Sequence, residues 1–257
     1  MVRDMKAIRQ GQIQAMLARH EICTVAELVR GLGVSPSTIR RDLADLAARG
    51  EVVRERGGAR SADSSDADEA TPFVEVAEHN RLAKEAIARR AVSMVADGDV
   101  VIIDIGTTTR LLARHLRGRA VTVVTTSLTV LDELRPDPAT EVILVGGVLR
   151  RAYHSLVGVI AEDVLSKLSA DLAFLGTSGV NARGQVLDTS LVEVPVKRAM
   201  LRAAGRHVLL ADHDKFPGAG ALEVTGVEGF DAVVTDHQTG QEALEMLADR
   251  QVEVVVA

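Results

Sequence analysis

The sequence predicts an α/β protein in two parts: a small winged helix-turn-helix domain, then a larger domain built on a mostly parallel β-sheet. Residues 1–60 contain three short helical patterns followed by an alternating segment. Residues 73–257 alternate between apolar strand patterns and helical patterns. The chain is 47% hydrophobic but holds only one Tyr, four Phe and no Trp, so its core is aliphatic, which suits a buried parallel sheet. We expect domains at 1–59 and 73–257, joined by a linker at 60–72.

The composition narrows the class of protein. A single cysteine, Cys23, cannot form an internal disulfide and fits a reducing cytoplasm, which is the expected location. It also removes any cysteine-based zinc site, and we expect no metal and no cofactor. No apolar run is long enough to cross a bilayer, and the first ten residues lack the apolar stretch of a signal peptide.

The charge is unevenly distributed along the chain. The net charge is −6, but residues 1–60 carry 11 basic and 7 acidic side chains, whereas residues 61–257 carry 19 and 29. A basic first part on an acidic second part is typical of a protein in which only the first part contacts nucleic-acid phosphates. The alternative is that this asymmetry arose by chance.

Three helices are predicted in residues 1–60. The first covers about 4–19. The second opens at Thr24, where Glu27 completes a capping box, and is followed by a tight turn in which Gly33 is free to take a positive φ. The third opens with Ser35 as N-cap and Pro36 at its first position, a strong start signal.

The third helix carries hydroxyl side chains and two arginines on the face opposite its apolar stripe, and a basic ribbon over residues 51–59 follows as the predicted wing. Hydroxyls hold phosphates, and arginine reaches the O6 and N7 atoms of guanine in the major groove. The alternative is a three-helix bundle that binds another protein. The candidate DNA-contacting residues are Ser35, Ser37, Thr38, Arg40, Arg41, Arg54 and Arg56.

Residues 34–43, VSPSTIRRDL, followed by Leu46, Gly50, Arg54 and the Gly-Gly-Ala at 57–59, resemble the N-terminal signature of the DeoR family of bacterial transcriptional repressors. One departure is Arg56, where the family usually has His. The resemblance implies binding to a double-stranded DNA operator.

The linker, RSADSSDADEAT, has no apolar periodicity and is expected to be a flexible or semi-ordered connection. A long amphipathic helix is predicted over about 74–95. Buried strands are predicted, with helical patterns between most of them, at 100–104, 121–125, 142–145, 172–175, 208–211, 232–235 and 252–256.

Ligands of parallel sheets gather at the carboxyl ends of the strands, and polar or glycine-rich segments follow four of the predicted strands. The segment DIGTTT at 104–109 predicts an anion cradle of backbone N–H groups and hydroxyls at a helix start. The alternative is that these hydroxyls only cap the helix. Thr126-Ser127, Gly147 and the segment 176–179 follow later strands, and each alone could be an ordinary turn.

Glu193 and Lys197 are spaced i, i+4 at a helix start, and a surface ion pair is the alternative to a binding role. Asp212 and Lys215 follow the strand at 208–211, where the alternative is a surface turn. Lys84 lies on the first helix of this part of the chain and carries no signal alone.

The same segments, with VGG at 145–147, FLGTSG at 174–179, LADHDKF at 210–216 and VTD at 234–236, resemble the effector domain of DeoR regulators. That domain is similar in fold to ribose-5-phosphate isomerase. The resemblance implies a sugar phosphate held between Lys84 and the threonines. Thr126 and Asn181 depart from the family pattern. The candidate effector-binding residues are Lys84, Asp104, Gly106, Thr107, Thr108, Thr109, Thr126, Ser127, Gly147, Gly176, Ser178, Gly179, Glu193, Lys197, Asp212 and Lys215.

We therefore expect a cytoplasmic, homodimeric or homotetrameric repressor of a carbohydrate-utilisation operon, relieved by a phosphorylated sugar and without catalytic residues. One alternative is a sugar-phosphate isomerase with Glu193 as its base. Against it, those enzymes carry an acidic cluster where this chain has the neutral segment 176–179. A cofactor-dependent oxidoreductase is the other alternative, and no nucleotide-binding fingerprint is present.

Overall fold

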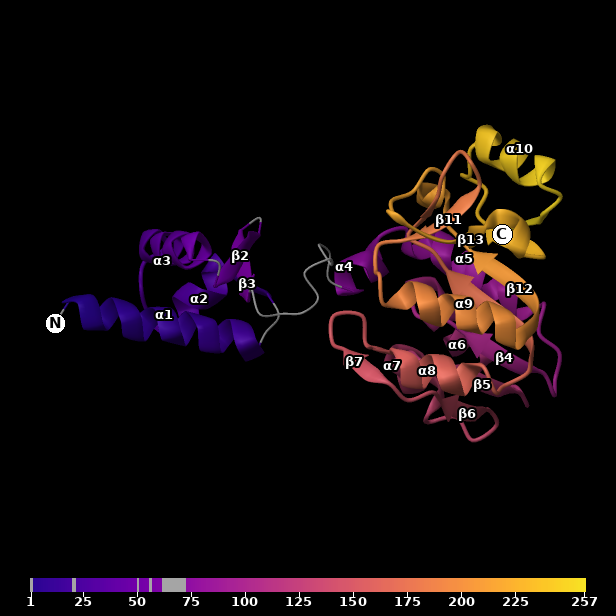
Figure 1. Ribbon diagram of the computed structural model, residues 1–257, viewed down its shortest axis with the longest axis horizontal. Helices are drawn as coiled ribbons and strands as arrows, with labels where there is room; N and C mark the ends of the chain where they lie inside the picture. The colour runs from indigo at the N-terminus through magenta and orange to yellow at the C-terminus, as the bar shows by residue number, and fades with distance from the viewer. Residues whose placement is uncertain (1, 20–21, 50, 56, 62–72) are drawn as a thin grey trace. The chain divides into compact units, whose positions relative to one another are not determined.

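The computed structural model describes residues 2–19, 22–49, 51–55, 57–61 and 73–257. The chain divides into two compact units, Met1–Ala67, here called the head, and Asp68–Ala257, here called the body (Figure 1). The head contains three helices and a small antiparallel sheet of order β1-β3-β2. Its elements are α1 (Val2–Arg19), β1 (Ile22–Thr24), α2 (Val25–Leu32), α3 (Pro36–Ala48), β2 (Val52–Glu55) and β3 (Gly58–Ser61).

Local chemistry explains where the head helices begin and end. Thr24 caps α2 and exchanges hydrogen bonds with Glu27, as the capping-box pattern predicts. Gly33 ends the helix with φ 66°, and the Ser35 side chain accepts a hydrogen bond from the backbone of Thr38 to open α3. Together with the small antiparallel sheet, these helices confirm the predicted winged helix-turn-helix class.

The wing is larger than predicted, because β1 was not anticipated and β3 continues through residues 60 and 61, which were expected to belong to the linker. A side chain at Gly58 would clash with the backbone carbonyl of Cys23, so β1 and β3 pair closely only because Gly58 has none. The rest of the expected linker, residues 62–72, lies outside the described residues.

The body is built on a seven-stranded sheet of order β15-β14-β12-β9-β4-β5-β6 in which every pair is parallel, and the predicted α/β class is confirmed. Each strand corresponds to one predicted from the sequence. They are β4 (Val100–Ile103), β5 (Thr122–Thr125), β6 (Glu141–Leu144), β9 (Ala170–Gly176), β12 (Ala204–Leu210), β14 (Ala232–Thr235) and β15 (Glu253–Val256).

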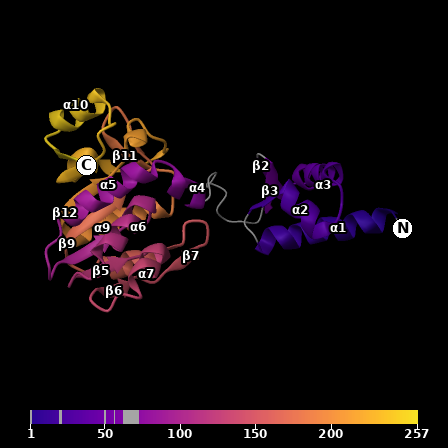
Figure 2. The same cartoon turned by 180° about the vertical axis from the view of Figure 1, so that it is seen from behind.

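Helices cover both faces of this sheet (Figure 2). They are α4 (Phe73–Glu78), α5 (Arg81–Val92), α6 (Thr107–Leu116), α7 (Leu128–Leu134), α8 (Val159–Leu165), α9 (Glu193–Ala203) and α10 (Gln241–Asp249). Alternate residues of β4 show the division between the two faces: Val101 and Ile103 pack on the side of α5, α6 and α7, whereas Ile102 packs on the side of α8, α9 and α10.

The predicted single helix over 74–95 was wrong, because the chain breaks between α4 and α5. Asn80 takes a left-handed conformation with φ 51° at the break. The short strands outside the main sheet were also not anticipated. They are the hairpin β7 (Val148–Arg150) and β8 (Ser155–Val157), and the small sheet β10 (Gly179–Val180), β11 (Gln185–Asp188) and β13 (Leu222–Gly226).

Two short 3-10 turns complete the body. η1 (His213–Lys215) follows β12 and contributes Lys215 to the cavity described below, and η2 (Val227–Gly229) follows β13. Within the part of the chain that the structure describes, no helix is both long and apolar enough to span a membrane.

Candidate functional site

The first candidate site is the exposed start of α3 in the head. Ile39, Leu43 and Leu46 of this helix are buried in the head core, which turns the opposite face outward. On that outward face Arg40 and Arg41 are exposed. At the helix start the Ser35 hydroxyl lies 2.8 Å from the hydroxyls of Ser37 and Thr38, forming a small hydroxyl cluster beside free helix N–H groups.

The basic residues of the head fall into two groups. Arg9 and Arg49 form ion pairs within the head: Arg9 binds the buried Asp42 at 2.5 Å, and Arg49 binds Glu51 at 2.6 Å. The predicted DNA-contacting arginines form no ion pair with any residue that the structure describes, and all three of those described are exposed. They are Arg40, Arg41 and Arg54. The remaining predicted contact, Arg56, lies outside the described residues.

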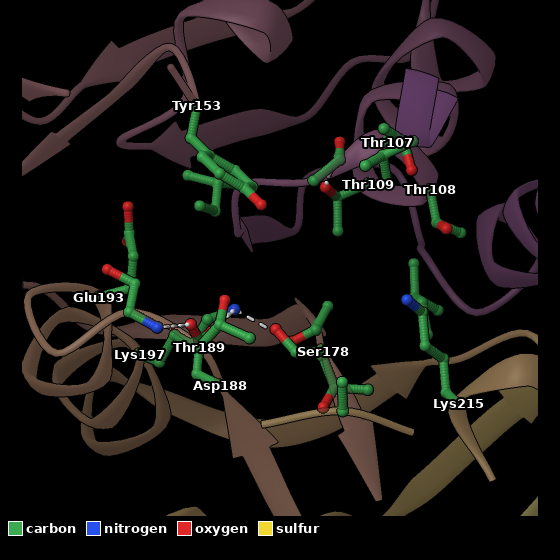
Figure 3. Close-up of a pocket in the computed structure, with 18 of the residues that line it drawn as sticks. Thr107, Thr108, Thr109, Tyr153, Ser178, Asp188, Thr189, Glu193, Lys197 and Lys215 are labelled. Atoms are coloured by element: carbon green, nitrogen blue, oxygen red, sulfur yellow. Dashed lines mark hydrogen bonds and ion pairs between the residues drawn. The ribbon is translucent and has the colours of Figure 1, made fainter. Parts of the chain in front are cut away.

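The second candidate site is a cavity of about 380 Å³ in the body (Figure 3). It opens at the carboxyl ends of the neighbouring strands β4, β9 and β12, where a parallel sheet is expected to bind ligands. The predicted residues that line it are Lys84, Gly106, Thr107, Thr108, Thr109, Gly176, Ser178, Glu193, Lys197, Asp212 and Lys215.

One end of the cavity is formed by the start of α6. Gly106 has φ 136°, a conformation that side-chain-bearing residues rarely adopt, and it turns the chain from β4 into the helix. The Thr109 hydroxyl donates back to the Gly106 carbonyl at 3.0 Å, so it caps the turn as the alternative interpretation supposed. The hydroxyls of Thr107 and Thr108 bond to no described residue and line the cavity. This end therefore offers hydroxyl and backbone donors to an anion.

Two lysines complete this end. The buried Lys84 donates from Nζ to the backbone carbonyl of Val76 in α4 at 2.5 Å. Burial lowers the pKa of Lys84, and the nearby charge of Lys215 acts in the same direction, while Asp212 opposes both. Lys215 lies in η1 and forms no ion pair among the described residues. Two cations close enough to influence each other indicate a site that an anion would stabilise.

At the other end, Lys197 of α9 is buried against carboxylates. Its ammonium group donates to Asp104 and to the Gly176 carbonyl, and Nζ lies 3.6 Å from Asp188. Burial disfavours the charged ammonium, but the two carboxylates outweigh it and raise the pKa of Lys197. Lys197 therefore stays charged, with its charge already neutralised. Asp104 lies behind this lysine and does not line the cavity.

Glu193 also forms a buried ion pair, but its partner is Arg150 and not Lys197. Its Oε1 atom accepts hydrogen bonds of 2.6 Å from both Arg150 and Ser155, and the side chain is only 1% exposed. Oε2 has no hydrogen-bond partner in the described part of the chain. Burial raises the pKa of Glu193. The surface ion pair between Glu193 and Lys197 was therefore the wrong alternative: each side chain has partners on other elements.

Some residues of the cavity were missed by sequence reasoning. Arg150 and Tyr153 come from the β7–β8 hairpin, where the Arg150 guanidinium lies 5.1 Å from the centre of the Tyr153 ring. Neither residue follows a main-sheet strand, so the expectation that ligands bind at the carboxyl ends of parallel strands does not point to them. Tyr153 is, however, the chain's single tyrosine. Ile105, Thr177 and Leu210 line the cavity within segments that the sequence singled out, although they were not among the candidate residues. The other lining residues outside the candidates are Val76, Arg150, Tyr153, Asp188, Thr189, Ser190 and Ala219.

Other predicted residues do not line the cavity. Thr126 and Ser127 are fully buried, and the Ser127 hydroxyl caps α7. Gly147 and Gly179 allow close backbone approach, since a side chain on Gly147 would meet Val157 and one on Gly179 would meet Gly218. With Asp104, these four predicted residues are therefore not part of the cavity lining.

No group of three or more His, Cys, Asp or Glu side chains in the described residues is arranged to hold a metal ion. A DNA-reading fold followed by a domain with a charged ligand pocket defines a ligand-responsive transcriptional regulator. The comparisons with known proteins agree. Residues 9–65 match the DeoR-like helix-turn-helix domain, and residues 79–237 match the DeoR C terminal sensor domain.

Several relatives match over nearly the full chain. The HTH-type transcriptional regulator GolR of Listeria innocua is 31% identical over 97% of this chain and 98% of its own. The glycerol-3-phosphate regulon repressor of Escherichia coli is 31% identical over 96% of this chain and 97% of its own. The L-fucose operon activator of Escherichia coli is 30% identical over 91% and 96%. The chain belongs to the DeoR family of transcriptional regulators.

Among solved structures, ribose 5-phosphate isomerase A of Methanocaldococcus jannaschii is similar with a TM-score of 0.40 and 19% identity, over 53% of this chain and 55% of that one. The delta subunit of eIF2B from Chaetomium thermophilum is similar with a TM-score of 0.42 and 19% identity, over 62% and 57%.

Proposed function

We propose that this protein represses a carbohydrate-utilisation operon by binding its operator through the head, and that a phosphorylated sugar bound in the body relieves the repression. The observation that carries the proposal is the donor-rich end of the cavity. There the free hydroxyls of Thr107 and Thr108 lie at the start of α6, near the buried Lys84 and near Lys215. Hydroxyls, a helix N-terminus and lysines together form the chemistry that recognises a phosphate.

In the proposed complex with DNA, α3 enters the major groove. Arg40 and Arg41 reach base edges or phosphates, the hydroxyls of Ser35, Ser37 and Thr38 hold the backbone, and Arg54 on the wing contacts a neighbouring phosphate. A dimer or tetramer would set two heads on half-sites about one helical turn, or a multiple of it, apart. Relatives named as repressors support this proposal, and one relative is named as an operon activator.

We propose further that the effector's signal leaves the body through α4. This helix is the first described element after residue 61, so it is the part of the body nearest to the head along the chain. Lys84 holds the Val76 carbonyl of α4, and the Asn80 side chain beyond it donates to Asp212 and Asp214 at 2.9 and 2.8 Å. An anion that binds Lys84 competes with the Val76 carbonyl, so α4 is held differently with and without effector.

No catalytic role is proposed for Glu193. Its Oε1 atom is fixed by Arg150 and Ser155, and the segment after β9 offers the hydroxyls of Thr177 and Ser178 in place of further carboxylates. The Oε2 atom can still accept a hydrogen bond, but the segment after β9 supplies no acidic group to act with it. Turnover of an aldose phosphate above about 1 s⁻¹, which is within the ordinary enzyme range, would contradict the proposal.

Two experiments test the proposed function. Selection from random duplexes should recover an operator that the full-length protein binds, with an affinity that falls steeply as salt is raised. A thermal-shift screen of sugar phosphates should find ligands that raise the melting temperature, because a ligand at 100 times its dissociation constant stabilises by about 2.7 kcal/mol. Failure to retain any duplex at low salt, or to respond to any sugar phosphate, would contradict the corresponding half of the proposal.

A further inference from the structure

The two ends of the cavity differ in whether their cations are available. Figure 3 shows Thr107, Thr108, Thr109 and Lys215 on one side and Asp188, Glu193 and Lys197 on the other. At the threonine end, Lys84 donates to a neutral carbonyl, and neither Lys84 nor Lys215 forms an ion pair with a described residue. Asp212 also lines this end and its charge acts on Lys84, but its carboxylate accepts a hydrogen bond from the Asn80 side chain. The charges of the two lysines are therefore available to a ligand.

At the opposite end each cation is already paired. Lys197 lies between Asp104 and Asp188, and Arg150 donates to Glu193. This end holds three carboxylates against two cations, so it has no positive charge to offer. A second anionic group placed here would meet neutralised cations and nearby carboxylate oxygens in a largely buried setting, where like charges repel strongly.

The same end has acceptors to offer. Glu193 Oε2 is buried without a hydrogen-bond partner in the described residues, and Asp188 lines the cavity with its carboxylate. A buried acceptor without a partner is costly, and a hydroxyl group of a ligand would satisfy it. The Tyr153 phenol and the Thr189 hydroxyl lie at this end too and can bond to hydroxyls.

We infer that the pocket selects ligands with a single anionic group: a sugar or polyol monophosphate whose phosphate lies at the threonine end and whose hydroxyls face Asp188 and Glu193. Bisphosphates and phosphorylated sugar acids, which carry a second negative charge at the far end, are rejected. This inference rests on the proposed function, because it names the class of effector that the same site accepts. The selectivity comes from the carboxylates, which repel a second anion, as much as from the donors that attract the first.

The test compares matched ligands by calorimetry on the full-length protein. The pairs are fructose 6-phosphate with fructose 1,6-bisphosphate, ribose 5-phosphate with ribose 1,5-bisphosphate, and glucose 6-phosphate with 6-phosphogluconate. Wherever the monophosphate of a pair binds, its doubly anionic partner should have a dissociation constant at least about tenfold higher, which corresponds to about 1.4 kcal/mol of binding free energy.

Two isosteric variants then locate the cause. Asp188→Asn removes a charge beside Lys197, and Glu193→Gln removes the charge that occupies Arg150, so each should improve bisphosphate binding relative to monophosphate binding by about tenfold. Asp163→Asn is the matched control, because this exposed residue of α8 pairs with Lys167 and does not line the cavity. It should leave the ratio unchanged.

The outcomes separate the inference from the proposed function. If monophosphates and their doubly anionic partners bind equally, or if neither variant changes the ratio while the monophosphate still binds, the inference is overturned and the proposed function stands. If no sugar phosphate of either kind binds the unmodified protein, the proposed function fails and the inference fails with it.

Discussion

Lys197 on α9 donates a hydrogen bond to the carboxylate of Asp104, which directly follows β4, 93 residues earlier in the chain. Both side chains are almost fully buried. The pair joins the helix on one face of the sheet to the end of a central strand, so it holds the floor of the cavity in place. Replacing either partner leaves a charge in the interior without its counter-charge.

Lys197→Met should therefore destabilise the body by about 3–5 kcal/mol, the usual loss when one member of a buried pair is removed. Urea unfolding followed by circular dichroism measures this loss. The double variant Lys197→Met with Asp104→Asn should recover much of it, because only Asp188, 3.6 Å from the ammonium group in the unmodified protein, then lacks its counter-charge. Lys167→Met, which breaks the exposed pair with Asp163, is the control and should cost at most about 1 kcal/mol. A single variant as stable as the control would refute this structural role.

Arg40→Ala and Arg41→Ala should each weaken operator binding, because both side chains are exposed on α3 and neither is used by the fold. Loss of a contact to a base should cost about 1–3 kcal/mol of binding free energy and relax sequence preference. Loss of a phosphate contact should instead lower the slope of log affinity against log salt concentration by about one. Fluorescence anisotropy at several salt concentrations distinguishes the two kinds of contact. Arg135→Ala, an exposed arginine of the body, removes the same charge and should have no effect.

Thr107→Val should weaken effector binding by about 1.5–3 kcal/mol, the worth of a hydrogen bond to a charged group, and leave operator binding unchanged. Valine keeps the shape of threonine and removes only the hydroxyl that faces the cavity. Thr122→Val on β5, whose hydroxyl bonds to Glu141 outside the cavity, is the matched control. Calorimetry with the best sugar phosphate would contradict the assignment if both variants bound it equally well.

Asn80→Ala should uncouple the two functions. Asn80 does not line the cavity, but its side chain ties the α4–α5 break to Asp212 and Asp214. We expect effector affinity to change less than about threefold, while the factor by which effector weakens operator binding, typically 5–150-fold, falls toward one. Gln241→Ala, an exposed residue of α10, serves as a control of similar chemistry. Retention of the full coupling factor in Asn80→Ala would exclude α4 as the route.

Effector affinity should also depend on pH through Lys84. Burial lowers the pKa of Lys84 from its ordinary value of 10.5, so the ammonium loses its proton at a lower pH than an exposed lysine would. Above the second pKa of the phosphate, about 6, affinity should stay constant until the pH approaches the lowered pKa of Lys84, and it should fall as the pH rises through that pKa. Lys84→Arg should extend binding to higher pH, because arginine stays protonated. Identical pH profiles for the two proteins would contradict a role for Lys84 in binding the anion.

The sequence was sufficient to predict all seven strands of the main sheet, because a strand buried on both faces is a continuous apolar run. It was also sufficient for the helix starts at Thr24 and Ser35, where capping chemistry is local. The break at Asn80 was missed because the apolar pattern continues across it, and the left-handed residue is held by contacts with Asp212 and Asp214, more than 130 residues away.

The same distinction between local and distant chemistry applies to the cavity. Residues directly after main-sheet strands, such as Thr107 and Ser178, could be predicted because parallel strands end at one edge. Arg150 and Tyr153 could not, because the β7–β8 hairpin brings them in from outside that rule. Nor does the i, i+4 spacing of Glu193 and Lys197 reveal that each side chain binds a partner on another element.

The most direct test of the account measures the operator dissociation constant of the full-length protein with and without a saturating sugar monophosphate. Repression relieved by effector predicts that the monophosphate weakens operator binding by about 5–150-fold, and that operator weakens monophosphate binding by the same factor. An operator affinity that is unchanged by a ligand shown to occupy the cavity would contradict the central claim that the pocket controls the head.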